Sequence, residues 1–374
     1  MMRVAIGAGG AAWEARTIAD IEAHRHLVLA RRCVDAADLV ATAESDHCDV
    51  ALVDPALPGL ALDLLDRVRA AGVRIVSVGT DASEWGITEA VPVGRLADLA
   101  MDTPLPAASA AHRGRVVAVW GPTGAPGRTT LAISLAAAAQ AAGERVVLVD
   151  ADIFGGSVAQ HLAILDDVSA LMAACRDANH GSLHDIARHL VKLDDGMHVL
   201  TGIPRSDMWI HVRARPFAHV LEALIATHDL VVIDTSFGIE SGASIAATHD
   251  QVALHVLEHA DATVVVGRAD PIGIARLVRA LDEASGLLRE HLLVLNGMRR
   301  SIGWSEDELT QAVGQLTGRK VDAVLPWDQL AIDQALMAGV PVRETTPGSA
   351  YAMRVELLLR QVRQVVGSGA VCNV

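Results

Sequence analysis

The sequence is poor in aromatic side chains, which make up 3% of its 374 residues, whereas hydrophobic residues of all kinds make up 51%. Its cores must therefore be built from alanine, valine, leucine and isoleucine, a composition typical of parallel sheets covered by helices. This amount of apolar material is sufficient for two cores of ordinary size. We expect two α/β domains.

Positive charge and paired cysteines are scarce as well. The formal net charge is −14, which disfavours broad non-specific attraction to DNA phosphates or to an anionic membrane surface. The four cysteines, Cys33, Cys48, Cys175 and Cys372, form no C-x-x-C pair. Neither a zinc site nor a disulfide framework is indicated.

Long hydrophobic runs are also missing. The N-terminus has no basic segment followed by an apolar core of signal-peptide type. The most alanine-rich stretch, 131–142, contains Gln140 and is too short to cross a bilayer. We expect a cytoplasmic protein that can associate with the cell pole or a membrane through partners, and direct peripheral contact with a membrane is not favoured.

A segment rich in proline, alanine and serine, 101–114, lies between two strand-like runs and predicts an interdomain linker. The domains are then 1–100 and 115–374. In both, short apolar runs alternate with helix-length segments, which predicts parallel sheets with helices on both faces. The strand-like runs are 3–6, 49–54 and 74–79 before the linker, and 115–120, 145–150, 230–234, 262–267, 292–296 and 321–325 after it.

The run 115–120 is followed by a glycine-rich segment and a helix that stops at Gly143. This order is typical of a phosphate-binding loop, in which backbone N–H groups converge on phosphate oxygens, a cation reaches the outer phosphates and a hydroxyl binds Mg²⁺. The pattern departs from G-x-x-x-x-G-K-[ST], with Pro122 at the first glycine and Arg128 at the lysine, so an ordinary glycine-rich turn is the alternative. The expected nucleotide contacts are Gly121, Thr123, Gly124, Ala125, Pro126, Gly127, Arg128, Thr129 and Thr130.

Carboxylates end two further apolar runs. Asp150 and Asp152 follow the strand after this loop, and Asp234 ends the strand 230–234. The carboxyl edge of an open parallel sheet is where ligands bind, and carboxylates there can hold a Mg²⁺-bound water or orient an attacking water. Helix capping is the structural alternative for Asp150 and Asp152.

With these motifs, 115–374 resembles the MinD/ParA family of deviant Walker A ATPases. Asp150-Ala-Asp152 matches the D-x-D of the family, and Asp234-Thr-Ser-Phe-Gly-Ile-Glu240 resembles its Walker B region. Asn296 resembles the asparagine with which the family contacts the adenine, and Pro326 lies in Leu325-Pro-Trp-Asp328, which resembles the I-P-x-D segment of the family. Both are expected to bind nucleotide. The resemblance implies ATP and Mg²⁺ as cofactors, Arg128 on the phosphates, Asp152 as the residue that orients the water, and an ATP-dependent homodimer. The metal would be held by Thr129, with Asp150 and Asp234 partly in an outer layer of ligands.

One departure concerns turnover. In this family a second lysine, four residues before the glycine of G-K-[ST], reaches across the dimer to the phosphates of the partner, and Thr123 stands at that position here. Loss of a cation that acts across an interface can slow hydrolysis by roughly 10³-fold or more, by analogy with arginine fingers. We expect a weak ATPase at most.

The N-terminal domain carries Asp54 after an apolar run, which resembles the phosphoacceptor strand of response-regulator receiver domains. The acidic pair expected after the first strand is replaced by Gly7-Ala-Gly-Gly10, so Asp54 is interpreted as a vestigial phosphoacceptor. The prediction is a flavodoxin-like, receiver-like domain that binds protein partners. This domain order resembles the CpaE/TadZ group, which implies a positioning role in Tad/Flp pilus assembly.

Three alternatives remain open. The chain could be a partitioning or septum-site ATPase, although its negative charge makes DNA an unfavoured partner. It could also be a docking platform that needs no nucleotide, or an enzyme that uses ATP to drive other chemistry. The C-terminal segment has an apolar stripe from Val355 to Val366, which predicts packing on the sheet rather than binding to a membrane.

Overall fold

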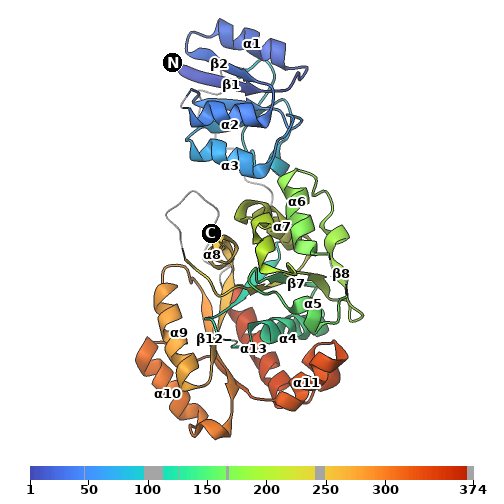
Figure 1. Cartoon of the computed structure of the whole chain (residues 1–374), viewed down its shortest axis with the longest axis vertical. Helices are drawn as coiled ribbons and strands as arrows, with labels where there is room; N and C mark the ends of the chain where they lie inside the picture. The colour runs from blue at the N-terminus through green and yellow to red at the C-terminus, as the bar shows by residue number, and fades with distance from the viewer. Residues whose placement is uncertain (46, 97–112, 125, 166–167, 241–248, 369–374) are drawn as a thin grey trace. The chain divides into compact units, whose positions relative to one another are not determined.

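The structure is a computed structural model of the chain, and it describes residues 1–45, 47–96, 113–124, 126–165, 168–240 and 249–368 (Figure 1). The chain divides into two compact units, Met1–Ala110 with Arg176–His184 and Ala111–Cys175 with Asp185–Val374. The sequence did not predict that Arg176–His184 would group with the first unit. The proposed linker, 101–114, falls almost entirely outside the described residues, so its limits stay a prediction.

The first unit contains a five-stranded sheet in the order β2-β1-β3-β4-β5, in which all neighbouring strands are parallel. Every residue of the central strand β3 is buried, and alternate residues of β3 join two separate apolar cores. Both faces of the sheet are therefore covered. The elements are β1 Met2–Gly7, α1 Glu14–Ala23, β2 Leu27–Cys33, α2 Ala36–Glu44, β3 Val50–Val53, α3 Leu62–Ala70, β4 Arg74–Val78 and β5 Ala90–Val91.

The second unit contains an eight-stranded sheet in the order β13-β12-β11-β6-β10-β7-β9-β8. Only β8 and β9 are antiparallel among the described pairs, so the mainly parallel α/β fold predicted from the sequence is confirmed. The strands are β6 Arg115–Trp120, β7 Val146–Ala151, β8 Val191–Lys192, β9 His198–Leu200, β10 Leu230–Thr235, β11 Ala262–Arg268, β12 His291–Met298 and β13 Ala323–Pro326.

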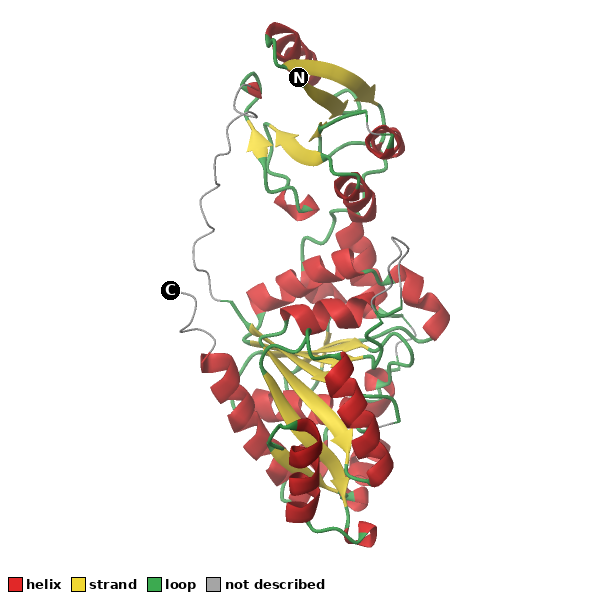
Figure 2. Ribbon diagram, turned by 90° about the vertical axis from the view of Figure 1, so that its left-hand side faces the viewer, coloured by secondary structure: helices red, strands yellow, loops and turns green. Residues whose placement is uncertain are grey.

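Helices lie on both faces of this sheet (Figure 2). Alternate residues of β6, β7 and β10 form one core with α4 and α13, because successive side chains of a strand point to opposite faces. The helices are α4 Arg128–Ala141, α5 Val158–His161, α6 Ala170–Asn179, α7 Ala214–Thr227, α8 Gln251–His259, α9 Pro271–Glu283, α10 Glu306–Thr317, α11 Gln329–Ala338, α12 Val342–Thr345 and α13 Ala350–Ser368.

The order of the strands reverses around β6. After β6 the chain continues in β7, and β10 later fills the place between these two strands. From β10 the chain crosses to β11, which lies on the other side of β6. Open parallel sheets bind ligands outside the carboxyl ends of their strands at such a reversal. The loop that follows β6 therefore lies where the topology favours a binding site.

The apolar stripe of α13 faces inward, as the sequence predicted. Val355, Leu358 and Val362 are almost completely buried in the core that also holds α4. Across the described residues, none of the helices combines the length and the apolar character needed to cross a membrane.

We predict that Leu358→Ala destabilises the protein by about 2–5 kcal/mol, because it opens a cavity at a fully buried position. The neighbouring Leu357 is 50% exposed, so Leu357→Ala is a matched control with an expected change within about 0.5 kcal/mol. Urea denaturation followed by circular dichroism measures both. Equal loss of stability in the two variants would show that α13 does not pack as described.

Candidate functional site

Strand β10 lies between β6 and β7 and aligns their carboxyl ends. Asp234 is in register with Val119 of β6 on one side and with Asp150 of β7 on the other. Both carboxylates are almost completely buried. The sheet thus brings the loop after β6 to the same edge as Asp150 and Asp234, as the sequence predicted.

The loop after β6 depends on glycine at close approaches. A Cβ on Gly121 would lie 2.2 Å from the carbonyl oxygen of Val266 in β11. Gly127, with φ +89°, is the residue that precedes α4 and offers no side chain to cap that helix. The first N–H groups of α4 are therefore left for a ligand, and the dipole of the helix favours an anion there.

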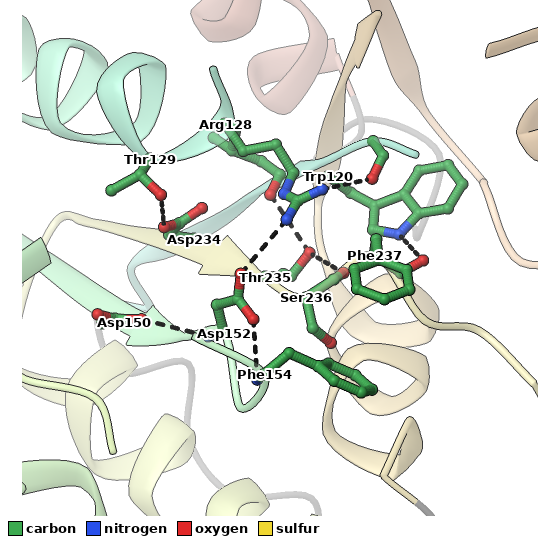
Figure 3. A network of polar contacts seen from close by, with 12 residues as sticks. Trp120, Arg128, Thr129, Asp150, Asp152, Phe154, Asp234, Thr235, Ser236 and Phe237 are labelled. Atoms are coloured by element: carbon green, nitrogen blue, oxygen red, sulfur yellow. Dashed lines mark hydrogen bonds and ion pairs between the residues drawn. The ribbon is translucent and has the colours of Figure 1, made fainter. Parts of the chain in front are cut away.

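Thr129, in the first turn of α4, donates a hydrogen bond from its hydroxyl to Oδ2 of Asp234 at 2.6 Å (Figure 3). The other carboxylate oxygen of Asp234, Oδ1, is buried and has no hydrogen-bond partner. A buried carboxylate oxygen without a partner is costly. A cation beside Thr129 and Asp234 would satisfy it.

Arg128 binds its own loop and a carboxylate from β7. Its Nη1 donates to the carbonyl oxygens of Gly121 at 2.9 Å and Pro122 at 3.2 Å, and its Nη2 lies 3.3 Å from Oδ2 of Asp152 (Figure 3). Both side chains of this ion pair are nearly buried, at 12% and 11% exposure. The sequence predicted that Arg128 and Asp152 belong to one site, but it did not predict the ion pair between them.

Asp150 has a structural task. Its carboxylate accepts the backbone N–H groups of Asp152 at 3.2 Å and Val158 at 3.1 Å. A Cβ on Gly156 or Gly202 would lie 2.7 Å from this carboxylate, so those two glycines leave room for it. Asp150 thereby fixes the turn that carries Asp152.

Burial dominates the electrostatics of this edge. It raises the pKa of Asp234 to about 7, against the opposing effects of the Thr129 hydrogen bond and the Arg128 charge. Burial, reinforced by the charge of Asp234, also raises the pKa of Asp150 well above its usual range. The two carboxylates therefore resist being ionised together without a further cation.

Asn296 is joined to the loop through its side chain. Its Nδ2 donates to the carbonyl oxygen of Pro126 at 2.8 Å, and a Cβ on Gly127 would lie 2.3 Å from the same nitrogen. Pro326 lies at the end of β13, paired with Met298 of β12. Thr130 follows Thr129 in α4, Thr123 and Gly124 are exposed in the loop, and Ala125 lies outside the described residues.

An aromatic cluster that was not predicted from the sequence lies beside this site. Phe154 packs against Phe237 with ring centroids 4.9 Å apart, and His249 stacks between Phe154 and Trp209 at 5.4 and 4.0 Å. The backbone N–H of Phe154 donates to Asp152, and the indole of Trp120 donates to the carbonyl of Phe237. The segments that carry Asp152 and Asp234 are thus linked by ring contacts (Figure 3).

In the first unit, Asp54 follows β3 and has two donors. The indole Nε1 of Trp13 donates to its Oδ2 at 2.6 Å, and the backbone N–H of Ala56 donates to its Oδ1 at 2.8 Å. Trp13 comes from the segment after β1, where a receiver domain would carry its acidic pair. An indole ring contributes no charge for a metal.

These residues fit a magnesium ion and a phosphate chain. A hydroxyl and a carboxylate face each other at Thr129 and Asp234, and oxygen is the ligand that Mg²⁺ prefers. Within the described ranges, no group of three or more histidine, cysteine, aspartate or glutamate side chains is arranged to hold a metal. An ion at Thr129 would therefore complete its coordination with phosphate oxygens and water.

Solved structures with a similar fold cover the second unit. MinD from Pyrococcus horikoshii, complexed with Mg-ADP, aligns with a TM-score of 0.55 and 18% identity over 69% of this chain and 99% of its own. A ParA family ATPase from Chlorobium tepidum aligns with a TM-score of 0.58 and 15% identity over 67% of this chain and 100% of its own. The McdA(D38A)-ATP complex from Cyanothece aligns with a TM-score of 0.50 and 17% identity over 69% and 97%.

The second unit has the fold of the MinD/ParA P-loop ATPases. No protein-family model and no curated protein sequence matches the chain.

We predict that the protein free of metal and nucleotide loses stability as the pH rises from about 4 to about 7. The pKa of Asp234 is raised from 3.8 to about 7 by folding, so the folded state binds the proton more tightly and the associated stability is present below pH 4 and lost above 7. Thermal unfolding at pH 5 and pH 8 measures the difference.

Asp234→Asn is the matched control, since its amide oxygen still accepts the Thr129 hydroxyl but does not titrate. The difference between pH 5 and pH 8 should shrink in this variant. An unchanged difference would show that Asp234 is ionised throughout that range.

Proposed function

We propose that the chain binds ATP with Mg²⁺ and works as a nucleotide-dependent positioning or scaffold protein. The observation that carries this proposal is the contact of the Thr129 hydroxyl with the buried carboxylate of Asp234, beside the pair of Arg128 and Asp152. Two proteins with this fold, MinD in complex with Mg-ADP and McdA(D38A) in complex with ATP, support the choice of nucleotide and metal.

Each residue of the site has a task in this proposal. The first N–H groups of α4 and the Arg128 guanidinium bind the phosphates, which a planar fork of donors can do in bidentate fashion. Thr129 and Asp234 would hold Mg²⁺, with the Thr129 hydroxyl donating to Asp234, and Asp152 would orient the attacking water. A bound Mg²⁺ would neutralise part of the negative charge of the ATP phosphates.

Arg128 must change partners when phosphate arrives. Its guanidinium is bonded to two carbonyls of the loop and to Asp152. Transfer of this cation to a phosphate frees Asp152, which can then accept from a water. Nucleotide binding is thereby coupled to the segment that carries Asp152 and Phe154.

We further propose the CpaE/TadZ type, with a role in polar localisation of Tad/Flp pilus assembly. The strand order of the first unit, β2-β1-β3-β4-β5, is the 2-1-3-4-5 order of flavodoxin-like folds and supports a receiver-like domain. The two donors on Asp54 support its being a vestigial phosphoacceptor that holds the loop after β3. Such a domain would bind protein partners, including pilus assembly components.

Partitioning or septum-site ATPases share the same fold, so the similar structures fit that alternative equally well. The net charge of −14 favours the scaffold role over DNA binding. An electrophoretic shift with non-specific DNA at low salt, seen only with ATP, would support partitioning instead. Genes for a secretion ATPase and pilins beside the gene of this protein would support the pilus role.

We predict that ATP with Mg²⁺ converts the protein from monomer to dimer and that ADP does not. Sedimentation velocity of the intact chain measures the change, and Arg128→Ala should abolish it by weakening the binding of phosphate. The loss of hydrogen bonds to a charged phosphate is worth about 1.5–3 kcal/mol each.

A chain that binds ATP but stays monomeric at all concentrations would contradict the dimer. If calorimetry detects no binding of ATP or ADP at millimolar nucleotide, the remaining alternative is a docking platform that needs no nucleotide.

We predict a turnover of ATP far below the roughly 10 s⁻¹ that is typical of enzymes, because Thr123 offers no cation to the phosphates. Thr123→Ala should leave the low rate unchanged, and Asp152→Ala should abolish it while nucleotide binding persists. A phosphate-release assay measures all three proteins. Turnover of several per second in the wild type, undiminished by Thr123→Ala, would show that the missing lysine does not limit hydrolysis.

A further inference from the structure

A cavity of about 310 Å³ lies between the first half of the phosphate-binding loop and the start of α9. Thr123 and Gly124 line it from the loop, and Arg268, Ile272 and Arg276 line it from β11 and α9. None of these β11 and α9 residues belongs to the constellation of Arg128, Thr129, Asp152 and Asp234. The cavity therefore adds a second set of side chains to the same loop.

The cavity carries a positive charge that is not neutralised. Arg268 is paired with Asp270, with Nε 2.7 Å from Oδ2, and Asp270 also caps α9 through the N–H of Gly273. Arg276 is exposed, and no carboxylate lies within 4.0 Å of it among the residues that the structure describes. Its charge is available to an anion.

Arg276 is held directly against the loop. Its Nη1 donates to the carbonyl oxygen of Thr123 at 3.4 Å. A Cβ on Gly124 would lie 1.9 Å from the same nitrogen, so a side chain there would displace the guanidinium, and the φ of +109° at Gly124 favours glycine. The guanidinium has five N–H donors, and this contact uses one of them.

Two arginines thus bind consecutive carbonyls of one loop. Arg128 takes those of Gly121 and Pro122, and Arg276 takes that of Thr123. A planar guanidinium with spare donors is suited to bidentate binding of phosphate. Thr123, which offers no charge itself, lies beside a cation that comes from another element of the fold.

We propose that this cavity is a phosphate subsite and that Arg276 is its ligand. The bound group is the outermost phosphate of a nucleoside triphosphate. This nucleoside triphosphate is bound either by the same chain or by a second copy of the chain. This inference rests on the proposed function, since it assigns a further binding residue to the same loop. It makes Arg276 a determinant of the preference for ATP over ADP.

The test is calorimetry of ATP, ADP and inorganic tripolyphosphate with the intact chain. Arg276→Ala should weaken binding of ATP and tripolyphosphate by about tenfold or more, the loss expected for a hydrogen bond to a charged group, and should change binding of ADP less than threefold. Arg276→Lys should recover part of the loss. Arg279 is exposed on the same helix and does not line the cavity, so Arg279→Ala is the matched control and should bind like the wild type.

Protein concentration separates the two sources of the phosphate. If the nucleotide of the same chain supplies it, the effect of Arg276→Ala on ATP binding is independent of protein concentration. If a second copy supplies it, the effect appears only at concentrations where sedimentation shows a dimer. Either result supports the subsite.

Wild-type affinity for ATP and tripolyphosphate in Arg276→Ala, or an equal loss in Arg279→Ala, would overturn the inference while the proposed function stands. Binding of tripolyphosphate that depends on Arg276, in a chain that does not bind ATP, would support the subsite and contradict the proposed function. A wild type that binds neither compound contradicts both.

Discussion

Two carboxyl groups are buried at the carboxyl ends of β7 and β10, and the local structure of the second unit is arranged around them. Asp150 of β7 and Asp234 of β10 are in register on neighbouring strands, and both are almost completely buried. Isolated buried carboxylates are strongly unfavourable. The local structure stabilises these groups. Backbone N–H groups donate to Asp150, the Thr129 hydroxyl donates to Asp234, and the Arg128 guanidinium pairs with the neighbouring Asp152. Oδ1 of Asp234 has no hydrogen-bond partner and is available to a cation.

Strand pairing and core packing hold this edge of the sheet in place. Parallel pairing aligns the strand ends, and the apolar residues of β6, β7 and β10 pack against α4 and α13 to hold the sheet rigid. Glycine at 121 and 127 lets the loop approach β11 and Asn296 closely. Arg276 binds the carbonyl oxygen of Thr123 with one of its N–H donors, so the start of the loop is held in place before a ligand arrives. A preorganised loop loses less entropy when it binds phosphate.

Much of this arrangement could be read from the sequence, because it depends on local patterns. Apolar runs that end in carboxylates predicted β7 and β10, and the glycine-rich turn predicted the junction of β6 and α4. The short or half-polar strands β2, β5, β8 and β9 were missed, since β2 exposes Arg31 and Arg32 and the other three have only two or three residues each. Such strands lack the periodicity from which strands are predicted.

Contacts between distant segments could not be read in the same way. Arg276 lies 153 residues from Thr123, and no local pattern distinguishes it from Arg279 on the same helix. Phe154 and Phe237 are brought together only by the register of β7 and β10. Trp13 meets Asp54 because β1 and β3 are neighbours in the first sheet. In each case topology supplies a partner that the segment itself does not specify.

Thr129 and Asp234 are proposed to form a magnesium site for ATP. Calorimetry of ATP binding to the intact chain, with Mg²⁺ and then with a chelator, tests it most directly when wild type and Thr129→Ala are compared. We expect Mg²⁺ to tighten ATP binding to the wild type and this gain to disappear in Thr129→Ala. Equal affinity with and without Mg²⁺ in the wild type, or a full gain from Mg²⁺ in the variant, would contradict it.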